Sequence, residues 1–184
     1  IKNTSVFVYG TTFLRAISAG TELAMTRSLS YKTVEGVAKA IDSATDSFYD
    51  ASGAIMDADK LQSETYYYGS IRGDEIAHYA YNMRLGTTSV RNVSVYYYDD
   101  KTADETGVTT DTAMNMSKTF KTTSFSGKID LTDPGIPNLQ STTYYQGDKG
   151  DEVSDYSLNY QVGTTTIKNT SVFVYGTTFL RAIS

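Results

Sequence analysis

The sequence contains no cysteine, no tryptophan, two prolines and one histidine. Without cysteine the chain can form neither a disulfide framework nor a thiolate metal site. The single histidine, His78, supports neither a histidine-based metal site nor a Ser-His-Asp arrangement with a spare base. We expect His78 to face solvent opposite Tyr79. Catalysis would have to rest on carboxylate pairs that the sequence does not locate, so we expect no enzymatic activity and no cofactor.

Concentrated positive charge is also absent. The formal net charge is −5, and Lys and Arg form no cluster. Nucleic-acid binding requires such clusters, so we expect no nucleic-acid partner. The sequence shows neither an apolar run long enough to span a bilayer nor a signal peptide, and both would be missing from a piece of a longer chain. We expect no membrane insertion in this segment.

Tyrosine is what the chain has in abundance. Sixteen tyrosines and seven phenylalanines supply the large rings of a chain that is 40% hydrophobic and 20% charged. Tyr, Thr, Val and Ser at this density favour pleated strands over helices. The length of 184 residues allows one sizeable core or two small ones.

The most informative feature is a repeat. The first eighteen residues, IKNTSVFVYGTTFLRAIS, return without change at residues 167–184. A looser repeat places residues 73–99 on residues 150–176, and a third places residues 24–33 on 113–122. The two shorter shifts add up to the longer one. The long period therefore consists of two unequal modules of roughly 80 residues each.

Each module contains strands that alternate between apolar and polar residues, the pattern of a half-buried sheet. Gly86 and Gly163 mark turns between two such strands, which predicts a hairpin in each module. The inward positions are expected at Tyr79, Tyr81, Met83 and Leu85, then Val93, Val95 and Tyr97, matched in the second module by Tyr156, Leu158, Tyr160 and Val162, then Thr170, Val172 and Val174. Residues 34–48 fit either a short helix or a strand and loop.

These residues carry a family resemblance. Gly73-Asp74-Glu75-Ile76, the alternating tyrosine strand, the Gly86 turn and the Asn92-x-x-Val95 strand resemble the conserved Ig-like repeat of bacterial and archaeal surface proteins. The stretch from Ala19 to Tyr31 is similar to a later strand of that repeat, and residues 109–120 resemble it more faintly. The resemblance implies a non-enzymatic building block of an adhesin, stalk or surface appendage.

We predict an all-β fold of two tandem Ig-like antiparallel sandwiches. Residues 47–123 form one complete module. The other module is split: residues 124–184 supply its first strands and residues 1–46 its last. A sandwich that lacks its final strands exposes an edge that recruits another strand. The identical end segments then compete for one position, which makes Ile1, Val6, Val8, Ile167, Val172 and Val174 the predicted assembly strand.

We therefore expect a structural subunit of an extracellular filament, sheath or surface layer, whose partners are other molecules of the same chain. One alternative is a slice of a long tandem-repeat adhesin with a glycan-binding or host-binding role. Another is that the last copy is an engineered donor strand, appended so that the chain can complement itself. A carbohydrate partner is left open because clustered tyrosine rings could stack on sugars.

Three further motifs suggest a binding or modification site but also fit a purely structural role. Arg72-Gly73-Asp74 spells an integrin-recognition tripeptide, although Gly-Asp belongs to the turn pattern of the module. Asp99, Asp100 and Asp104, with Glu105, are candidate calcium ligands or a solvated acidic loop. The Asn-x-Ser acceptor pattern for N-glycosylation occurs at Asn3, Asn92, Asn115 and Asn169.

Overall fold

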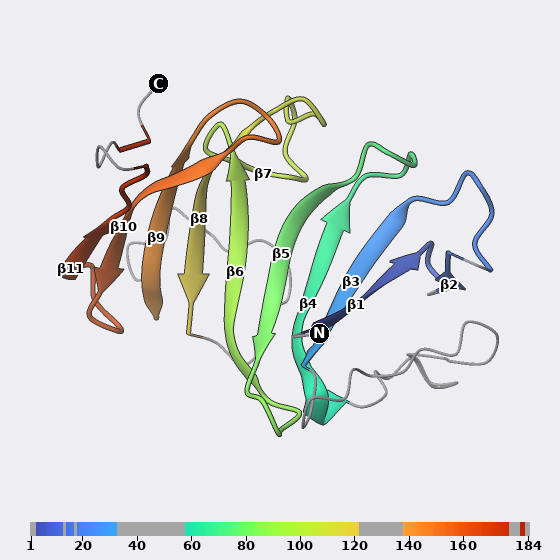
Figure 1. The fold of residues 1–184 in the computed structure, drawn as a ribbon, viewed down its shortest axis with the longest axis horizontal. Coiled ribbons are helices and arrows are strands. Elements are labelled where there is room, and N and C mark those ends of the chain that lie inside the picture. The colour runs from blue at the N-terminus through green and yellow to red at the C-terminus, as the bar shows by residue number, and fades with distance from the viewer. Residues whose placement is uncertain are drawn as a thin grey trace. The chain divides into compact units, whose positions relative to one another are not determined.

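The computed structural model describes residues 3–12, 14–16, 18–32, 58–121, 138–176 and 181–182. These residues form eleven strands and one 3-10 turn, η1 (Ala58–Lys60), so the all-β class is confirmed (Figure 1). All strand pairs described below are antiparallel. Ile1 and the stretch 34–48, where a helix was one alternative, lie outside the described residues.

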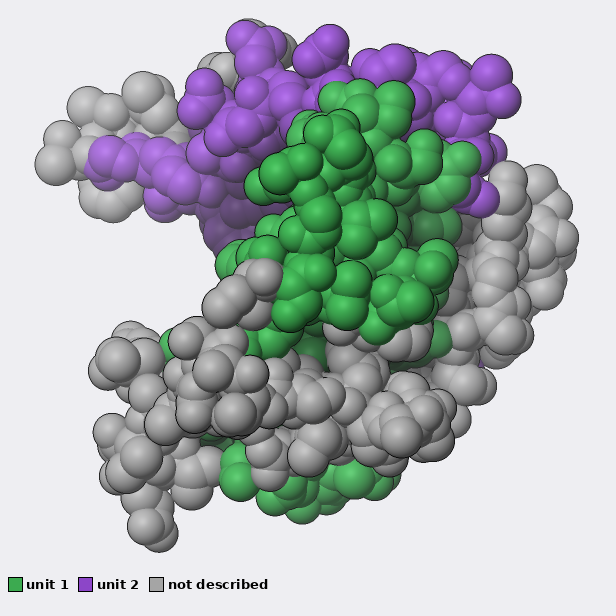
Figure 2. All heavy atoms as spheres, turned by 90° about the vertical axis from the view of Figure 1, so that its right-hand side faces the viewer, with its two compact units in different colours: residues 1–91 green, residues 92–184 purple. Residues whose placement is uncertain are grey.

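The chain divides into two compact units, residues 1–91 and residues 92–184 (Figure 2). In unit 1 the strands are β1 (Asn3–Tyr9), β2 (Leu14–Arg15), β3 (Met25–Lys32), β4 (Leu61–Tyr68) and β5 (Ile76–Met83), in the sheet order β5-β4-β3-β1-β2. Strand β6 (Val90–Tyr98) begins at the end of unit 1 and lies mostly in unit 2. The other strands of unit 2 are β7 (Lys101–Thr102), β8 (Met114–Phe120), β9 (Leu139–Gln146), β10 (Val153–Tyr160) and β11 (Ile167–Val172). The sheet order is β11-β10-β9-β8-β6, with β7 beside β6.

The predicted sandwich is not confirmed. In each unit the described strands belong to a single antiparallel layer, and a second, facing sheet is not found among them. Alternation correctly identifies strands with one buried face, but it carries no information on what covers that face. The predicted module boundaries near residues 46 and 123 lie outside the described residues. The division into one complete and one split module therefore stays a prediction.

Alternation locates the buried residues correctly in β6 but not in β5, β10 or β11. Val93, Val95 and Tyr97 are buried, as predicted. Leu85 and Val162, predicted to point inward, are 47% and 50% exposed because each lies in the turn beyond its strand. Backbone hydrogen bonds from Arg84 N to Ser89 O and from Gln161 N to Thr166 O, both 2.9 Å, close the two turns.

In β5 and β10 the predicted inward residues are only half-buried. The buried residues have the opposite phase: Ile76 and Ala80 in β5, and Asp155 and Ser157 in β10. The residues predicted to point inward in the last strand, Thr170, Val172 and Val174, are exposed.

The two units repeat the same registers. The β1–β3 pair shifts register between Val8 and Tyr9, and the β6–β8 pair shifts between Tyr97 and Tyr98, at positions that the sequence repeat superimposes. A β-bulge re-aims the side chains that follow it and increases local twist. The repeated bulge shows that both units bend the strand pair at the same place.

The second strand pair of each unit repeats as well. Tyr66 lies opposite Tyr79 in β4–β5, and Tyr144 lies opposite Tyr156 in β9–β10. Each pair of rings is stacked with centroids 4.6 Å apart, and a register shift lies next to each pair. Cross-strand aromatic pairs contribute about 0.5 to 1 kcal/mol each and help to fix register.

A glutamate connects the turn before β5 to the start of β3. Glu75 accepts hydrogen bonds from Met25 N at 2.6 Å through Oε1 and from Gly73 N at 2.8 Å through Oε2. Arg72 donates from Nη1 to Thr21 O at 2.9 Å. The turn is thus held at both of its ends by contacts to the segment that leads into β3.

Glu152 has the same role in unit 2. It accepts hydrogen bonds from Met114 N at 3.1 Å and Gly150 N at 2.9 Å. Partial burial raises the pKa of Glu152, but these hydrogen bonds together with the charge of Lys149 outweigh burial, and the pKa lies below its ordinary value of 4.5. The Glu152 side chain is therefore an ionised carboxylate at neutral pH.

Because the folded pKa of Glu152 is lowered, its stabilising effect is complete above the ordinary value and is lost as pH falls through the folded value. We expect Glu152→Gln to lower the free energy of unfolding by about 1 kcal/mol at pH 7. The gap to wild type should close between about pH 4.5 and the folded pKa. Urea unfolding followed by circular dichroism at pH 7 and pH 3 measures both values. The neighbouring exposed Asp151→Asn is the control; equal losses from both substitutions would contradict the assignment.

Candidate functional site: the repeated strand at β1 and β11

The first copy of the repeated segment forms β1, and the valines on its inner face are buried. Val6 and Val8 are 4% and 1% exposed, whereas Phe7 between them is 49% exposed. The two valines belong to one core cluster with Leu29 and Tyr31 of β3 and Leu61 of β4, and Met83 packs against that cluster. Burial of each valine stabilises the fold by about 1.5 to 2 kcal/mol.

Backbone pairing with β3 holds β1 in place. Thr4 lies opposite Tyr31, Val6 opposite Leu29 and Val8 opposite Arg27. Beyond the bulge, Gly10 N donates to Ala24 O at 3.0 Å. Neighbouring residues of a strand direct their N–H groups to opposite sides. The even-numbered residues of β1 therefore donate toward β3.

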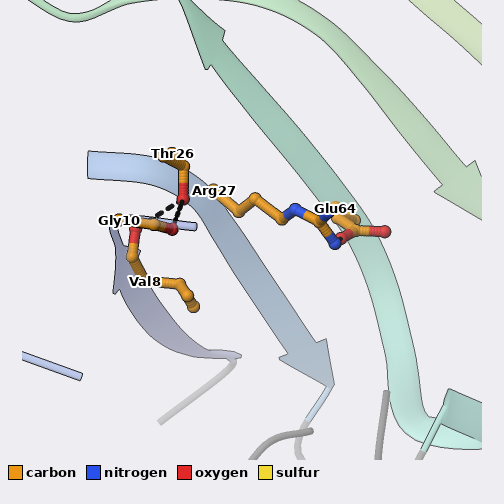
Figure 3. Close-up of polar contacts among 5 residues, drawn as sticks. All are labelled: Val8, Gly10, Thr26, Arg27 and Glu64. Carbon is orange, nitrogen blue, oxygen red and sulfur yellow. Dashed lines mark hydrogen bonds and ion pairs between the residues drawn. The ribbon is translucent and has the colours of Figure 1, made fainter. Parts of the chain in front are cut away.

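The residue at the bulge ties the two strands together further. Thr26 donates its hydroxyl to Gly10 O at 3.0 Å and, more weakly, to Val8 O at 3.4 Å (Figure 3). Beside it, Arg27 forms an ion pair with Glu64 of β4 at 3.0 Å, and its guanidinium lies 4.6 Å from the centre of the Tyr66 ring. Glu64 is 5% exposed, so the ion pair gives a buried carboxylate a charged partner.

The last copy of the same segment has the opposite environment. All six residues of β11 are exposed. Val172 and Val174 correspond to Val6 and Val8, but they are 52% and 51% exposed. Ile167, Phe173 and Tyr175 are exposed as well. An identical sequence therefore has two burial states, and what differs is the strand beside it.

The β11 segment, here residues 167–176, is paired on one side only. Its partner is β10, with Val172 opposite Tyr156 and Thr170 opposite Leu158. Phe173 N donates to Asp155 O at 2.9 Å. At the far end, the Tyr175 hydroxyl donates to Ser154 O at 2.6 Å. β11 is the last strand in the order of unit 2, so no described strand lies along its outer edge.

The two copies use complementary edges of the same strand. Phe173, the counterpart of Phe7, directs its N–H to β10. By alternation, Val172 and Val174 direct theirs to the outer edge, and these are the counterparts of the residues of β1 that donate to β3. The β11 segment can therefore keep β10 on one side and accept a β3-like strand on the other.

An ion pair between the exposed Arg181 and the buried Asp155 fixes the chain beyond β11. Arg181 donates from Nε and Nη2 to the two carboxylate oxygens of Asp155, at 2.9 and 2.6 Å. Asp155 is 3% exposed, and its hydrogen bonds and charge raise the pKa of Arg181. Arg181 is the repeat of Arg15, which lies in β2 beside β1. The pair anchors the last copy to β10.

Most residues of the predicted assembly strand fall into two groups. Val6 and Val8 are brought together in the core of unit 1, whereas Ile167, Val172 and Val174 lie exposed on the β11 segment. Ile1 lies outside the described residues. Sequence reasoning did not find the anchor made by Asp155 and Arg181. The available signal was Asp155 itself, which stands at the place of His78 in the first module.

The integrin tripeptide and His78 have structural explanations. Arg72 and Gly73 take part in the turn contacts described above, and Asp74 N donates to Ile71 O at 3.1 Å within the same turn. His78 is half-buried rather than solvent-facing, and its ring makes edge contacts with Tyr68 and Tyr79. The integrin hypothesis stays a prediction.

The acidic loop uses its carboxylates locally. Asp99 and Asp100 form the two-residue turn between β6 and β7, both with positive φ. Asp104 accepts from the Thr102 hydroxyl at 2.6 Å, and Glu105 accepts from Thr102 N at 2.7 Å. Within the described ranges no group of three or more His, Cys, Asp or Glu side chains is arranged to hold a metal ion.

The four glycosylation motifs lie in different environments. Asn3 and Asn169 are exposed, and Asn169 accepts a hydrogen bond from Asn159 Nδ2 at 2.8 Å. Asn92 donates to Gln140 at 3.1 Å, and Asn115 donates to Asp100 at 2.9 Å. These hydrogen bonds give Asn92, Asn115 and Asn169 a structural role. Glycosylation stays a prediction at all four sites.

Half-buried tyrosines gather on unit 1. Tyr66 and Tyr79 stack on each other, and Tyr81 makes edge contacts with both. Burial raises the pKa of Tyr79 to about 12, helped by the nearby Tyr81. The three rings therefore contact one another. Of the described tyrosines, Tyr31, Tyr97 and Tyr98 are the buried ones.

Comparisons of this chain with protein-family models, with curated proteins and with solved structures find no match. The Ig-like resemblance therefore stays an expectation from the sequence. In the described part of the chain no helix is long and apolar enough to cross a membrane. The two environments of the repeated strand are the feature on which a functional argument can rest.

The repeat supplies its own matched pair for testing the two burial states. We expect Val8→Ala to lower the free energy of unfolding by about 2 kcal/mol, because it leaves a cavity between β1 and β3. Val174→Ala, at the same position of the same sequence, should change it by less than about 0.5 kcal/mol in dilute solution. Urea unfolding of both variants measures the difference. Equal losses would show that the β11 segment is buried as β1 is.

Proposed function

We propose that this chain is a structural repeat unit of an extracellular filament, sheath or surface layer, and that its molecules join head to tail through the β11 segment. One observation carries the proposal: the sequence that is buried as β1 is exposed as β11 at the edge of a sheet. The extracellular location rests on the resemblance to surface-protein repeats. The proposal assigns the chain no catalytic role and no cofactor.

An edge of this kind favours association. Edge strands offer a row of unpaired backbone groups, and proteins generally protect them with charges, prolines or bulges. Among Ile167–Val172 the only charged side chain is Lys168. The exposed apolar residues Val172 and Val174 add a face that water solvates poorly.

The geometry of such a contact favours an open chain. The β11 edge belongs to unit 2, and its sequence twin β1 belongs to unit 1. A contact between two different patches of identical molecules is heterologous, and it propagates into a fibre unless the rotation closes a ring. Head-to-tail growth follows from the positions of the two copies in the chain.

The second candidate function is an adhesin of covalently linked repeats that binds glycans or a host surface. The observation that favours it is the cluster of Tyr66, Tyr79 and Tyr81, since aromatic rings gathered on one face are typical of sugar-binding surfaces. In that case the strand beyond β11 belongs to the same chain. Molecules that stay monomeric at every concentration and that bind a glycan array would favour this function.

The assembly proposal predicts a solution mass that grows with concentration. Light scattering after size exclusion should show species well above the 20.2 kDa monomer for wild type. The double substitution Val172→Lys and Val174→Lys should keep the chain monomeric, because two charges would be buried at the contact. Circular dichroism verifies that the variant is folded.

The matched control places the same two charges elsewhere on unit 2. Val153 and Val162 are 41% and 50% exposed and lie outside the β11 segment. Val153→Lys with Val162→Lys should assemble as wild type does. Wild-type chain that remains monomeric at all concentrations, or equal loss of assembly in both double variants, would refute the role of β11.

A further inference from the structure

We propose that the β11 segment pairs with strand β3 of a second molecule and takes there the register that β1 has in its own molecule. Val172 then lies opposite Leu29 of the second molecule, and Ser171 lies opposite Ser30. This inference rests on the proposed function, and it names the partner strand and the register. Its basis is that the same residues already occupy that position as β1.

The backbone is compatible with this pairing without rearrangement of β11. The segment holds β10 through the edge that includes Phe173 N. Its other edge carries the N–H groups of Val172 and Val174, the counterparts of those that β1 directs to β3. The bulge is also available, because Thr26 of β3 can donate to Gly176 O as it does to Gly10 O at 3.0 Å.

The side chains fit by identity. On the inner face of unit 1, Leu29, Tyr31 and Leu61 form the cluster that receives Val6 and Val8. Val172 and Val174 present the same two side chains in the same alternation. On the outer face, Phe173 remains exposed in the position of Phe7, which is 49% exposed. Val172 and Val174 would therefore make the same side-chain contacts in the second molecule that Val6 and Val8 make in the first.

Exchange of β11 for β1 leaves the core contacts unchanged. Which of the two copies occupies the site beside β3 therefore depends on the other contacts that hold each copy in place. Among the described strands, β1 has β3 on one side and the two-residue β2 on the other. The β11 segment is already ordered by β10 and by the bidentate Asp155–Arg181 pair. It therefore loses less conformational freedom on entering the site than the released β1 regains. Exchange of identical elements between molecules is a low-cost route to assembly.

Disulfide trapping tests the register directly, because the chain has no native cysteine. One batch of full-length chain carries Ser171→Cys and another carries Ser30→Cys, at positions whose β1 counterparts, Ser5 and Ser30, lie opposite each other. The batches are mixed at a concentration that supports assembly and oxidised. We expect a mixed dimer whose digest contains the peptide of residue 171 linked to that of residue 30.

Replacing Ser30→Cys by Ser28→Cys gives the register control. Ser28 lies on the same face two residues along β3, opposite the counterpart of Phe173. Diagonal neighbours are too far apart for an unstrained disulfide, so the mixed dimer should be lost or strongly reduced. Equal yields with Ser28→Cys and Ser30→Cys, or linkage of residue 171 to another position, would overturn the register.

A second variant tests whether β1 must leave. The pair Ser5→Cys and Ser30→Cys in one chain tethers β1 to β3 when oxidised, and assembly should stop until a reductant is added. The control pair, Thr143→Cys and Ser157→Cys, tethers opposite residues of β9 and β10 and should leave assembly unchanged. Growth of the oxidised Ser5–Ser30 chain to the wild-type mass would overturn the exchange.

The outcomes separate this inference from the proposed function. Suppose that the wild-type mass grows with concentration, but the cross-link between residues 171 and 30 does not form or the Ser5–Ser30 tether does not stop assembly. The proposed assembly then stands, and its pairing with β3 is wrong. If the mass never grows, both are wrong. A chain carrying both Ser171→Cys and Ser30→Cys that gives only a monomeric disulfide would show β11 pairing with β3 of its own molecule, which contradicts the second molecule as partner.

Discussion

The pairing of β1 with β3 is the interaction on which the rest of unit 1 depends. It places Val6 and Val8 against Leu29, Tyr31 and Leu61, and these five residues are the core cluster of that unit. The bulge at Thr26 then fixes where the pairing ends. The same pairing, with the same bulge, recurs between β6 and β8 in unit 2. The module is therefore defined by a strand pair and its register.

The β11 segment is the same first strand without its usual neighbour. Its exposure follows from the absence of a β3-like strand along its outer edge in the described structure, since its sequence is that of a buried strand. Burial in a sheet depends on the adjacent strand as much as on the residues themselves. The proposed assembly requires no change in the segment itself, only a β3 strand of a second molecule from which β1 has been released.

The sequence predicts the strands and the repeat better than the layers. Alternation identified the buried residues Val93, Val95 and Tyr97, because a strand of period two has one inner face. It failed at Leu85 and Val162, where the hairpin turns before the alternating pattern ends, and in β10, where Asp155 and Ser157 are buried in place of the predicted inward residues. The sandwich could not be derived, because periodicity describes one face of a strand and not the element that covers it.

The candidate site was predictable in part for a similar reason. Exact repetition of residues 1–18 identifies the segment, but no pattern within it distinguishes a buried copy from an exposed one. The anchor between Asp155 and Arg181 joins residues of different strands, so it becomes visible only when β10 and the last copy are placed side by side. Gly-Asp, in contrast, was assigned to the turn of the module from the sequence. The hydrogen bonds of Glu75 and Glu152 explain why a glutamate follows it.

Backbone amide hydrogen exchange of the dilute and the assembled chain tests the central claim most directly. It reports the protection of each amide, and the claim concerns two sets of amides with one sequence. In dilute solution the amides of Val6 and Val8 should be protected, and those of Val172 and Val174 should exchange rapidly. In the assembled chain Val172 and Val174 should become protected. Protection of Val172 and Val174 already in the dilute monomer, or rapid exchange in the assembly, would contradict the account.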